Sequence, residues 1–196
     1  MVGYLETKKF KITLLGEGAV GKTSLRKNFL GETFDRDYMM TLGADFATKV
    51  VEVDDYEVTL IIWDLAGQPR FSAVREGFYI GTRGALLVFD ITRPDTYEQL
   101  ANWVRELIKN NKNRKVPMVL IGNKNDLRGS LHTTIPEEYG AKYAKALSQW
   151  SGYNIPYIET SAKYGDNVEK AFENLVQEII KSTKTEAIHS YLKGEL

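Results

Sequence analysis

Cysteine is absent from all 196 residues of the chain. Its absence excludes disulfides, thiolate metal sites and a cysteine nucleophile, and leaves no residue for prenylation or palmitoylation. Glycine is third rather than second in MVGYLE, so N-myristoylation is not expected. No apolar run approaches the ~18 residues of a membrane span, and no signal peptide opens the chain. We therefore expect a cytoplasmic protein without a direct membrane anchor, which associates with membranes only through partners, if at all.

The chain also has no excess charge of either sign, since 26 Lys and Arg balance 26 Asp and Glu. A balanced charge gives no reason to expect nucleic acid as a partner. No internal repeat and no Pro-, Gly- or Ser-rich linker divides the sequence. The length suits one domain with a substantial core, and we expect a monomer.

Short apolar runs alternate with amphipathic segments along the chain. The patterns predict strands at 10–15, 44–53, 56–63, 84–91, 116–123 and 155–160, and helices from 22 and near 70–80, 95–110, 136–150 and 166–182. Partial alternation on both sides of Asp54-Asp55 predicts an antiparallel hairpin. The later apolar runs are typical of strands buried on both faces. This order predicts an α/β fold, with a mostly parallel sheet between layers of helices.

Two helix starts carry acidic pairs at capping-box spacing, Asp95 with Glu98 and Asp166 with Glu169. At the other end of the last helix, the final dozen or so residues have no clear pattern and are expected to fray.

The glycine-rich stretch Gly16-Glu17-Gly18-Ala19-Val20-Gly21-Lys22-Thr23-Ser24 follows a predicted strand and opens a predicted helix. It matches G-x-x-x-x-G-K-[ST], which in this context indicates a phosphate-binding loop. Glycines let successive N–H groups face an anion, and the helix start adds its free N–H groups and its dipole. A glycine-containing turn is the alternative, but a chance match arises in only about 1 in 100 such chains. Lys22 is expected to reach the β- and γ-phosphates and the Thr23 hydroxyl to ligate Mg²⁺, whereas the loop alone does not select the base or the reaction.

Asn123-Lys124-Asn125-Asp126 follows a predicted strand at its carboxyl end, where open α/β sheets bind ligands. The Asp126 carboxylate can accept two hydrogen bonds from guanine, whereas adenine has no such pair of donors. Lys124 can lay its aliphatic stem along the base. Farther on, Ser161-Ala162-Lys163 offers a backbone N–H to the guanine carbonyl. A polar loop would explain NKND alone, but the three segments in this order favour guanine.

Together GEGAVGKTS, YMMTLGADF, WDLAGQPRF, NKND and ETSAK resemble the Ras superfamily of small GTPases, and TLGADF and WDLAGQPRF most resemble its Rab branch. The resemblance covers residues 10–182. It implies a P-loop NTPase fold, a three-layer α/β/α sandwich whose mostly parallel six-stranded sheet has one antiparallel strand and about five helices. Residues 1–9 would be an N-terminal extension, and 183–196 a short C-terminal tail without a lipidation cysteine.

The activity implied by the resemblance is binding of GTP and GDP with Mg²⁺ and slow hydrolysis of GTP, coupled to switch regions around 34–46 and 64–80. Thr23, Thr41 and Asp64 would hold the metal. Gln68 would orient the attacking water, with Lys22 and Thr41 as the other catalytic residues. The expected nucleotide contacts are Gly16, Gly18, Ala19, Val20, Gly21, Lys22, Thr23, Ser24, Phe34, Tyr38, Thr41, Gly67, Asn123, Lys124, Asp126, Ser161, Ala162 and Lys163.

The resemblance also implies partners, namely a GTPase-activating protein, a nucleotide-exchange factor and effectors. Trp63, Phe46 and Tyr79 resemble the aromatic patch that effectors of Rab-like proteins contact, with core packing as an equal alternative. G-protein α-subunits carry a catalytic arginine three residues before the switch threonine, where this chain has Tyr38. We therefore expect slow intrinsic turnover and an arginine supplied by a partner.

Two residues of the second switch depart from the common pattern. Leu65 replaces a usual threonine, and Pro69 replaces the glutamate that usually follows Gln68. Proline disfavours helical geometry at Gln68, which could help or impair its aim. A GTP-bound interaction module that hydrolyses little therefore stays open as an alternative, whereas NKND argues against a P-loop kinase.

Overall fold

The computed structural model describes residues 5–32, 41–130 and 133–193. The strands are β1 Glu6–Leu15, β2 Ala44–Val53, β3 Tyr56–Leu65, β4 Gly84–Asp90, β5 Met118–Asn123 and β6 Tyr157–Thr160. The α-helices are α1 Lys22–Leu30, α2 Ser72–Arg75, α3 Pro94–Glu98, α4 Leu100–Asn110, α5 Glu137–Ser151 and α6 Val168–Leu192. Three short 3₁₀ turns are η1 Pro69–Phe71, η2 Glu76–Phe78 and η3 Asn125–Leu127.

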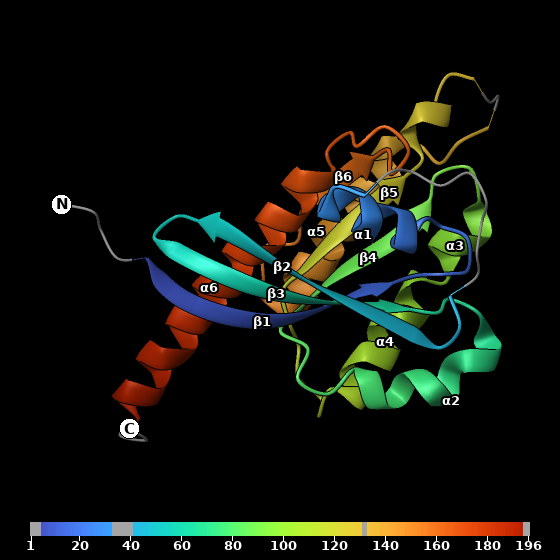
Figure 1. The fold of residues 1–196 in the computed structure, drawn as a ribbon. Helices are drawn as coiled ribbons and strands as arrows, with labels where there is room; N and C mark the ends of the chain where they lie inside the picture. The colour runs from blue at the N-terminus through green and yellow to red at the C-terminus, as the bar shows by residue number, and fades with distance from the viewer. Residues whose placement is uncertain (1–4, 33–40, 131–132, 194–196) are drawn as a thin grey trace.

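One six-stranded sheet runs through the molecule in the order β2-β3-β1-β4-β5-β6 (Figure 1). β2 pairs with β3 in the antiparallel sense, as the hairpin at Asp54-Asp55 predicts, and the other neighbouring strands are parallel. β4 and β5 are buried along their whole length, which explains their continuous apolar sequence. The predicted α/β sandwich is confirmed.

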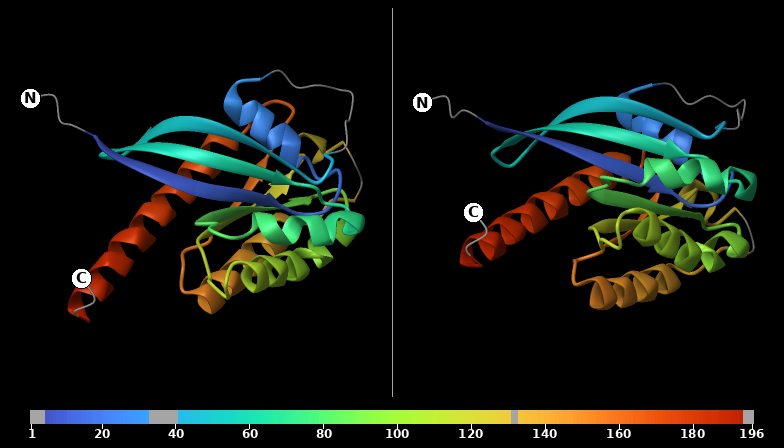
Figure 2. Two further views of the ribbon diagram at one scale, coloured as in Figure 1. Left: turned by 60° about the horizontal axis from the view of Figure 1, so that its bottom comes forward. Right: turned by 90° about the horizontal axis from the view of Figure 1, so that it is seen from below.

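Helices cover both faces of the sheet (Figure 2). One core lies between the sheet and the pair α1 and α6, where Phe29 stacks on Phe172 with ring centroids 3.8 Å apart. The second core joins the opposite face to α4 and α5 and includes Tyr79 and Trp103. Gln99 alone separates α3 from α4, so the six helical segments of the described residues form five helices, as expected.

Several predicted element boundaries are wrong. β1 begins at Glu6 rather than at residue 10, because Glu6–Lys9 extend the parallel ladder along β3. α6 continues to Leu192 rather than ending at 182, so residues 183–192 are helical. Within these extra turns, Glu186 pairs with Arg83 and Arg114. The expected domain boundaries at 10 and 182 fall inside these two elements.

The capping prediction is also wrong. Arg93 is the N-cap of α3, and Asp95 lies within its first turn. Asn167 is the N-cap of α6, with a left-handed backbone (φ 57°), while the carbonyl of Asp166 accepts a hydrogen bond from the Ser161 N–H. A spacing of three residues therefore places an acidic pair near a helix start without fixing which residue caps it.

The carboxyl ends of β1, β3, β4, β5 and β6 lie at the same end of the sheet, and the loops that follow them meet there. Such an edge is where open α/β sheets form ligand sites. Within the described residues, none of the helices has the length and apolar character needed to cross a bilayer.

Candidate functional site

The loop between β1 and α1 requires glycine at two positions. Gly16 has φ 140°, and a Cβ there would lie 2.0 Å from the Val88 carbonyl oxygen. Gly21 has φ 102°, and a Cβ there would lie 2.2 Å from Nδ2 of Asn123. Ala19 also has a left-handed backbone (φ 64°), which is uncommon for a residue with a side chain. The loop is therefore a tightly enclosed, constrained turn.

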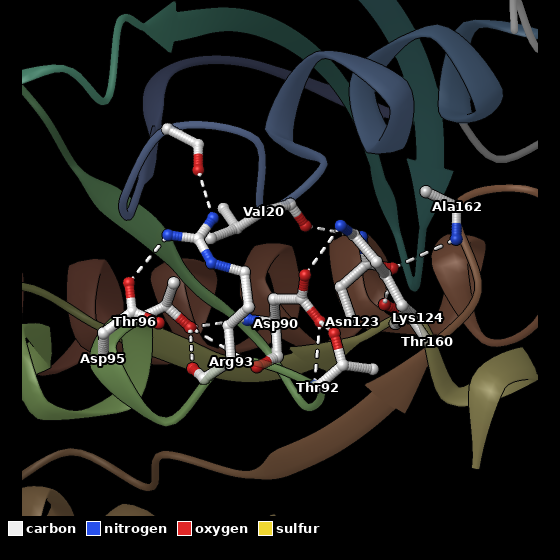
Figure 3. A network of polar contacts seen from close by, with 11 residues as sticks. Val20, Asp90, Thr92, Arg93, Asp95, Thr96, Asn123, Lys124, Thr160 and Ala162 are labelled. Atoms are coloured by element: carbon white, nitrogen blue, oxygen red, sulfur yellow. Dashed lines mark hydrogen bonds and ion pairs between the residues drawn. The ribbon is translucent and has the colours of Figure 1, made fainter. Parts of the chain in front are cut away.

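Side chains from other loops hold two carbonyl groups of this turn. Asn123 Nδ2 donates to the Val20 carbonyl at 2.8 Å, and Arg93 Nη1 donates to the Gly18 carbonyl at 2.9 Å (Figure 3). In a planar trans peptide the carbonyl and the following N–H point in opposite directions. Fixing these two carbonyls therefore turns the N–H groups of Ala19 and Gly21 away from Asn123 and Arg93. This orientation leaves both N–H groups available to an anion.

Lys22 opens α1 and is 6% exposed. Its Nζ donates to the carbonyl oxygens of Gly16 at 2.7 Å and Glu17 at 2.9 Å. Burial lowers the pKa of Lys22 to about 8, against the opposing charges of Asp64 and Glu17. An anion bound beside this ammonium would favour its charged form. Ser24 follows in the same first turn, half-buried.

Three side chains that carry oxygen atoms meet next to the glycine-rich loop, namely those of Thr23, Thr41 and Asp64. Thr23 Oγ1 donates to Asp64 Oδ2 at 2.5 Å and lies 3.0 Å from Thr41 Oγ1. Burial raises the pKa of Asp64, and the Thr23 hydrogen bond and the Lys22 charge oppose that rise. The second carboxylate oxygen, Oδ1, is buried and has no hydrogen-bond partner among the described residues. Two hydroxyls and a carboxylate with a spare oxygen fit the hard oxygen ligands that Mg²⁺ prefers.

Gly67 and Gln68 lie against the glycine-rich loop between β1 and α1. A Cβ on Gly67 would lie 2.4 Å from the backbone nitrogen of Gly18, and a Cβ on Gly18 would lie 3.4 Å from Gln68 Nε2. Gln68 has an extended backbone (φ −76°, ψ 140°), the geometry that Pro69 favours. The structure thus brings together Gly18, Gly67 and Gln68.

Asn123 joins the loops on the other side of the site. Its Oδ1 accepts hydrogen bonds from the Ala162 N–H at 3.1 Å and from Thr160 Oγ1 at 3.0 Å (Figure 3). Asp126 Oδ1 accepts a hydrogen bond from Ser161 Oγ at 2.7 Å. The loop after β6 is therefore fastened to the NKND segment, and through Asn123 to the phosphate loop.

Lys124 and Lys163, the two lysines next to the expected guanine contacts, have different surroundings in the structure. Lys124 has a left-handed backbone (φ 71°), and its Nζ lies 2.6 Å from Asp90 Oδ2, an oxygen of a fully buried carboxylate. Lys163 is exposed and lies over the ring of Tyr164. Sequence reasoning missed Asp90. The only sequence signal was its place at the end of a buried strand.

Arg75 and Glu106 were also missed. Arg75 is 3% exposed, and its guanidinium makes a bidentate contact with Glu106, with Nε–Oε1 2.8 Å and Nη2–Oε2 3.0 Å. Burial by itself lowers the pKa of Arg75, but the hydrogen bonds and charge of Glu106 outweigh it, so the pKa is raised. No sequence pattern links residues this far apart.

The aromatic patch differs from the predicted one by a single residue. Tyr79 is fully buried, and its hydroxyl donates to Glu106 Oε1 at 2.8 Å, so for this residue the alternative of core packing holds. Phe78 takes its place: the ring centroids of Phe46 and Trp63 are 5.1 Å apart, and those of Trp63 and Phe78 are 5.0 Å apart. Phe46 is 57% exposed. We call Phe46, Trp63 and Phe78 the aromatic patch below.

The predicted contacts Phe34 and Tyr38 lie outside the described residues. Among the other predicted site residues, Asp64 lies near the end of β3 and Asn123 is the last residue of β5. Lys22, Thr23 and Ser24 form the first turn of α1, Thr41 lies just before β2, and the rest lie in the loops that follow β1, β3, β5 and β6.

Comparison with known proteins identifies the family of the chain. The family model described as "Ras family" matches residues 11–181. Ras-related protein Rab7 of Pisum sativum is 41% identical over 182 residues, which cover 91% of this chain and 86% of the relative. Ras-related proteins RABA5b and RABG3f of Arabidopsis thaliana are each 40% identical, covering 92% and 91% of this chain and 79% and 86% of their own lengths.

Proposed function

Because this chain belongs to the Ras family and is a Rab-like GTP-binding switch GTPase, we propose that the site described above is where it binds and hydrolyses the nucleotide. The observation that carries this assignment is the link through Asn123, which joins the glycine-rich loop to both loops expected to contact guanine. The alternative of a weakly hydrolysing interaction module is not favoured by this membership.

In the proposed binding mode, the N–H groups of the glycine-rich loop and Lys22 hold the phosphates. Asp126 accepts hydrogen bonds from guanine, and the Lys124 stem lies along the base. A contact of the Ala162 N–H with the base carbonyl stays a prediction from the resemblance, since in this structure that N–H donates to Asn123 Oδ1. Contacts from Ser24, Phe34, Tyr38, Ser161 and Lys163 stay predictions from the resemblance. The same holds for a cytoplasmic location and for membrane association through partners.

Thr23, Thr41 and Asp64 would hold Mg²⁺, and the spare Asp64 oxygen supports this assignment. The metal would supply positive charge beside the phosphate oxygens.

Hydrolysis in this proposal depends on positioning and charge, since phosphoryl transfer needs little covalent chemistry from the protein. Gln68 orients the water, and Lys22 offsets charge that develops on the phosphate oxygens. Arg75 and Arg93 lie beside the site, but their guanidinium groups bind Glu106 and Asp95 and backbone carbonyls. We therefore propose that a GTPase-activating partner supplies the arginine for fast turnover.

Loss of the γ-phosphate would remove the contacts of Thr41 and the Gly67 N–H. A ligand shifts a protein between states only through contacts that differ between those states. These two contacts are therefore the proposed origin of switching in the segments around them.

Gln68→Ala tests the catalytic assignment. We expect single-turnover GTP hydrolysis to fall by about 10- to 100-fold, because an unaligned water loses the benefit of positioning. GDP affinity should stay within about twofold, since the side chain acts on the water rather than on the nucleotide. Timed phosphate release and labelled-GDP dissociation measure the two effects. Gln149→Ala, an exposed site on α5, is the matched control. Equal loss of GDP binding and of hydrolysis would contradict the assignment.

Phe46→Ala tests the aromatic patch as the proposed effector surface. We expect capture of GTP-dependent partners to fall by about tenfold, because exposed aromatic anchors dominate such interfaces. The thermal midpoint should change little, since the ring is 57% exposed. Quantitative pull-downs with protein loaded with a GTP analogue or GDP provide the measurement, with Ile188→Ala on α6 as control. Unchanged capture by Phe46→Ala protein would exclude this surface.

A further inference from the structure

Arg75 contacts the backbone of the segment that carries Gly67 and Gln68. Its Nη1 donates to the carbonyl oxygen of Ala66 at 2.8 Å and to that of Gln68 at 2.9 Å. One buried guanidinium thus fixes the carbonyls on both sides of Gly67.

The first contact sets the direction of an N–H group. Ala66 and Gly67 share a peptide plane, in which the carbonyl and the N–H point in opposite directions. Holding the Ala66 carbonyl toward Arg75 therefore turns the Gly67 N–H away from Arg75 and α4. Gly67 itself touches the phosphate loop on its other side, where an added Cβ would lie 2.4 Å from the carbonyl carbon of Glu17.

The second contact acts on Gln68. Its carbonyl is held by Arg75, and the next residue, Pro69, has no N–H and a restricted φ. The extended backbone of Gln68 (φ −76°, ψ 140°) is therefore constrained from both sides. A backbone fixed in this way limits the directions that the Gln68 side chain can take.

α4 provides a rigid anchor for Arg75. The guanidinium makes its bidentate contact with Glu106 and stacks over Trp103, with Cζ 4.5 Å from the ring centroid. Planar bidentate pairs orient a guanidinium more strictly than a single contact does. Trp103 Nε1 in turn donates to Glu17 Oε1 of the phosphate loop at 3.0 Å. Trp103 therefore connects the side chain of Arg75 to the glycine-rich loop, and Gly67 lies between Arg75 and that loop.

We propose that Arg75 is a positioning residue for the GTP-bound state, which sets the Gly67 N–H and the Gln68 backbone in the geometry that the γ-phosphate and the attacking water require. This inference rests on the proposed function of Gly67 and Gln68. GDP has no γ-phosphate, so Arg75 serves GTP binding and hydrolysis and contributes little to GDP binding.

Arg75→Lys is the test, because an ammonium keeps the charge but cannot span two carbonyls and both oxygens of Glu106. We expect single-turnover hydrolysis and affinity for a non-hydrolysable GTP analogue each to fall by about tenfold or more. GDP dissociation should stay within about twofold of the unsubstituted protein. A merely structural role would instead accelerate the release of both nucleotides alike.

Tyr79→Phe is the matched control within the same cluster. It removes the hydroxyl bond to Glu106 and lowers stability, yet leaves the contacts of Arg75 with Ala66 and Gln68 in place. We expect its ratio of GTP-analogue to GDP affinity to stay within about twofold of the unsubstituted value. If Arg75→Lys protein does not fold, Glu106→Gln takes its place, with the same GTP-selective loss expected at about threefold or more.

Equal effects of Arg75→Lys on the two nucleotides would overturn the inference, as would the same GTP-selective loss in Tyr79→Phe protein. Failure of the proposed function is distinguishable, because the unsubstituted protein would then neither bind guanine nucleotides nor hydrolyse GTP.

Discussion

Replacing Lys22 with alanine is expected to weaken GDP and GTP binding by about 10²- to 10⁴-fold. The ammonium is expected to donate two charge-assisted hydrogen bonds to the phosphates, each of about 1.5–3 kcal/mol, and alanine donates none. The side chain lies buried at the start of α1, beside the carbonyls of Gly16 and Glu17. Among the described residues near the glycine-rich loop, Arg75 and Arg93 could supply the lost positive charge only by moving, because they are paired with Glu106 and Asp95.

The fold itself should tolerate Lys22→Ala. Burial lowers the pKa of Lys22 to about 8, so at pH 7 the buried ammonium costs the folded state free energy relative to an unfolded lysine. That cost is present below about pH 8, where lysine is charged in both states, and is relieved as the pH rises toward 10.5. Removing the group removes the cost along with its two hydrogen bonds.

Thermal unfolding at pH 7 with increasing GDP separates the two effects. Ligand stabilises a fold in proportion to the logarithm of its concentration over Kd, so Lys22→Ala protein should lose most of the GDP-dependent rise in Tm. Lys27→Ala, in the last turn of the same helix, should keep that rise. A Lys22→Ala protein with an undiminished rise would mean that the glycine-rich loop is not the phosphate site.

Asp126→Ala is expected to lower GDP affinity by about 10²- to 10³-fold and to abolish most of the preference for guanine over adenine. The carboxylate would lose two hydrogen bonds to the base. Its Oδ1 also accepts a hydrogen bond from Ser161 Oγ at 2.7 Å, which orients the carboxylate. The phosphate contacts remain, so residual binding should no longer distinguish the two bases.

Competition of GDP and ADP for a fluorescent guanine nucleotide measures this preference directly. Asp55→Ala, in the exposed turn between β2 and β3, is the control and should leave both affinities unchanged. If Asp126→Ala protein still rejected ADP as strongly as the unsubstituted protein, another residue would select the base.

The parts of the site that the sequence predicted are local ones. Gly16 to Thr23 form one continuous segment of the chain, and Asn123 to Asp126 another, so each could be recognised from residue types and spacing. Their meeting followed from the parallel strands that precede them. The extended backbone of Gln68 is likewise local, since Pro69 adjoins it.

The contacts that were missed join segments with no fixed sequence separation. Arg93 reaches Gly18 because β4 lies beside β1, and Arg75 reaches Glu106 because α2 packs against α4. Whether Phe78 or Tyr79 belongs to the aromatic patch depends on the orientation of the short 3₁₀ turn η2. Two consecutive aromatic residues in the sequence do not reveal that orientation. In the part of α6 that was not predicted, Glu186 likewise pairs with arginines distant in sequence, Arg83 and Arg114.

Asn123 has a consequence for how a bound nucleotide leaves. The nitrogen of its side-chain amide donates to the Val20 carbonyl, and the oxygen accepts from the Ala162 N–H. A single side chain therefore connects the loop proposed to bind the phosphates with the loop proposed to face the base. In the proposed binding mode, a displacement of the glycine-rich loop would therefore also disturb the loop after β6 that is expected to face the base. Release of the nucleotide would then loosen the phosphate contacts and the base contacts together.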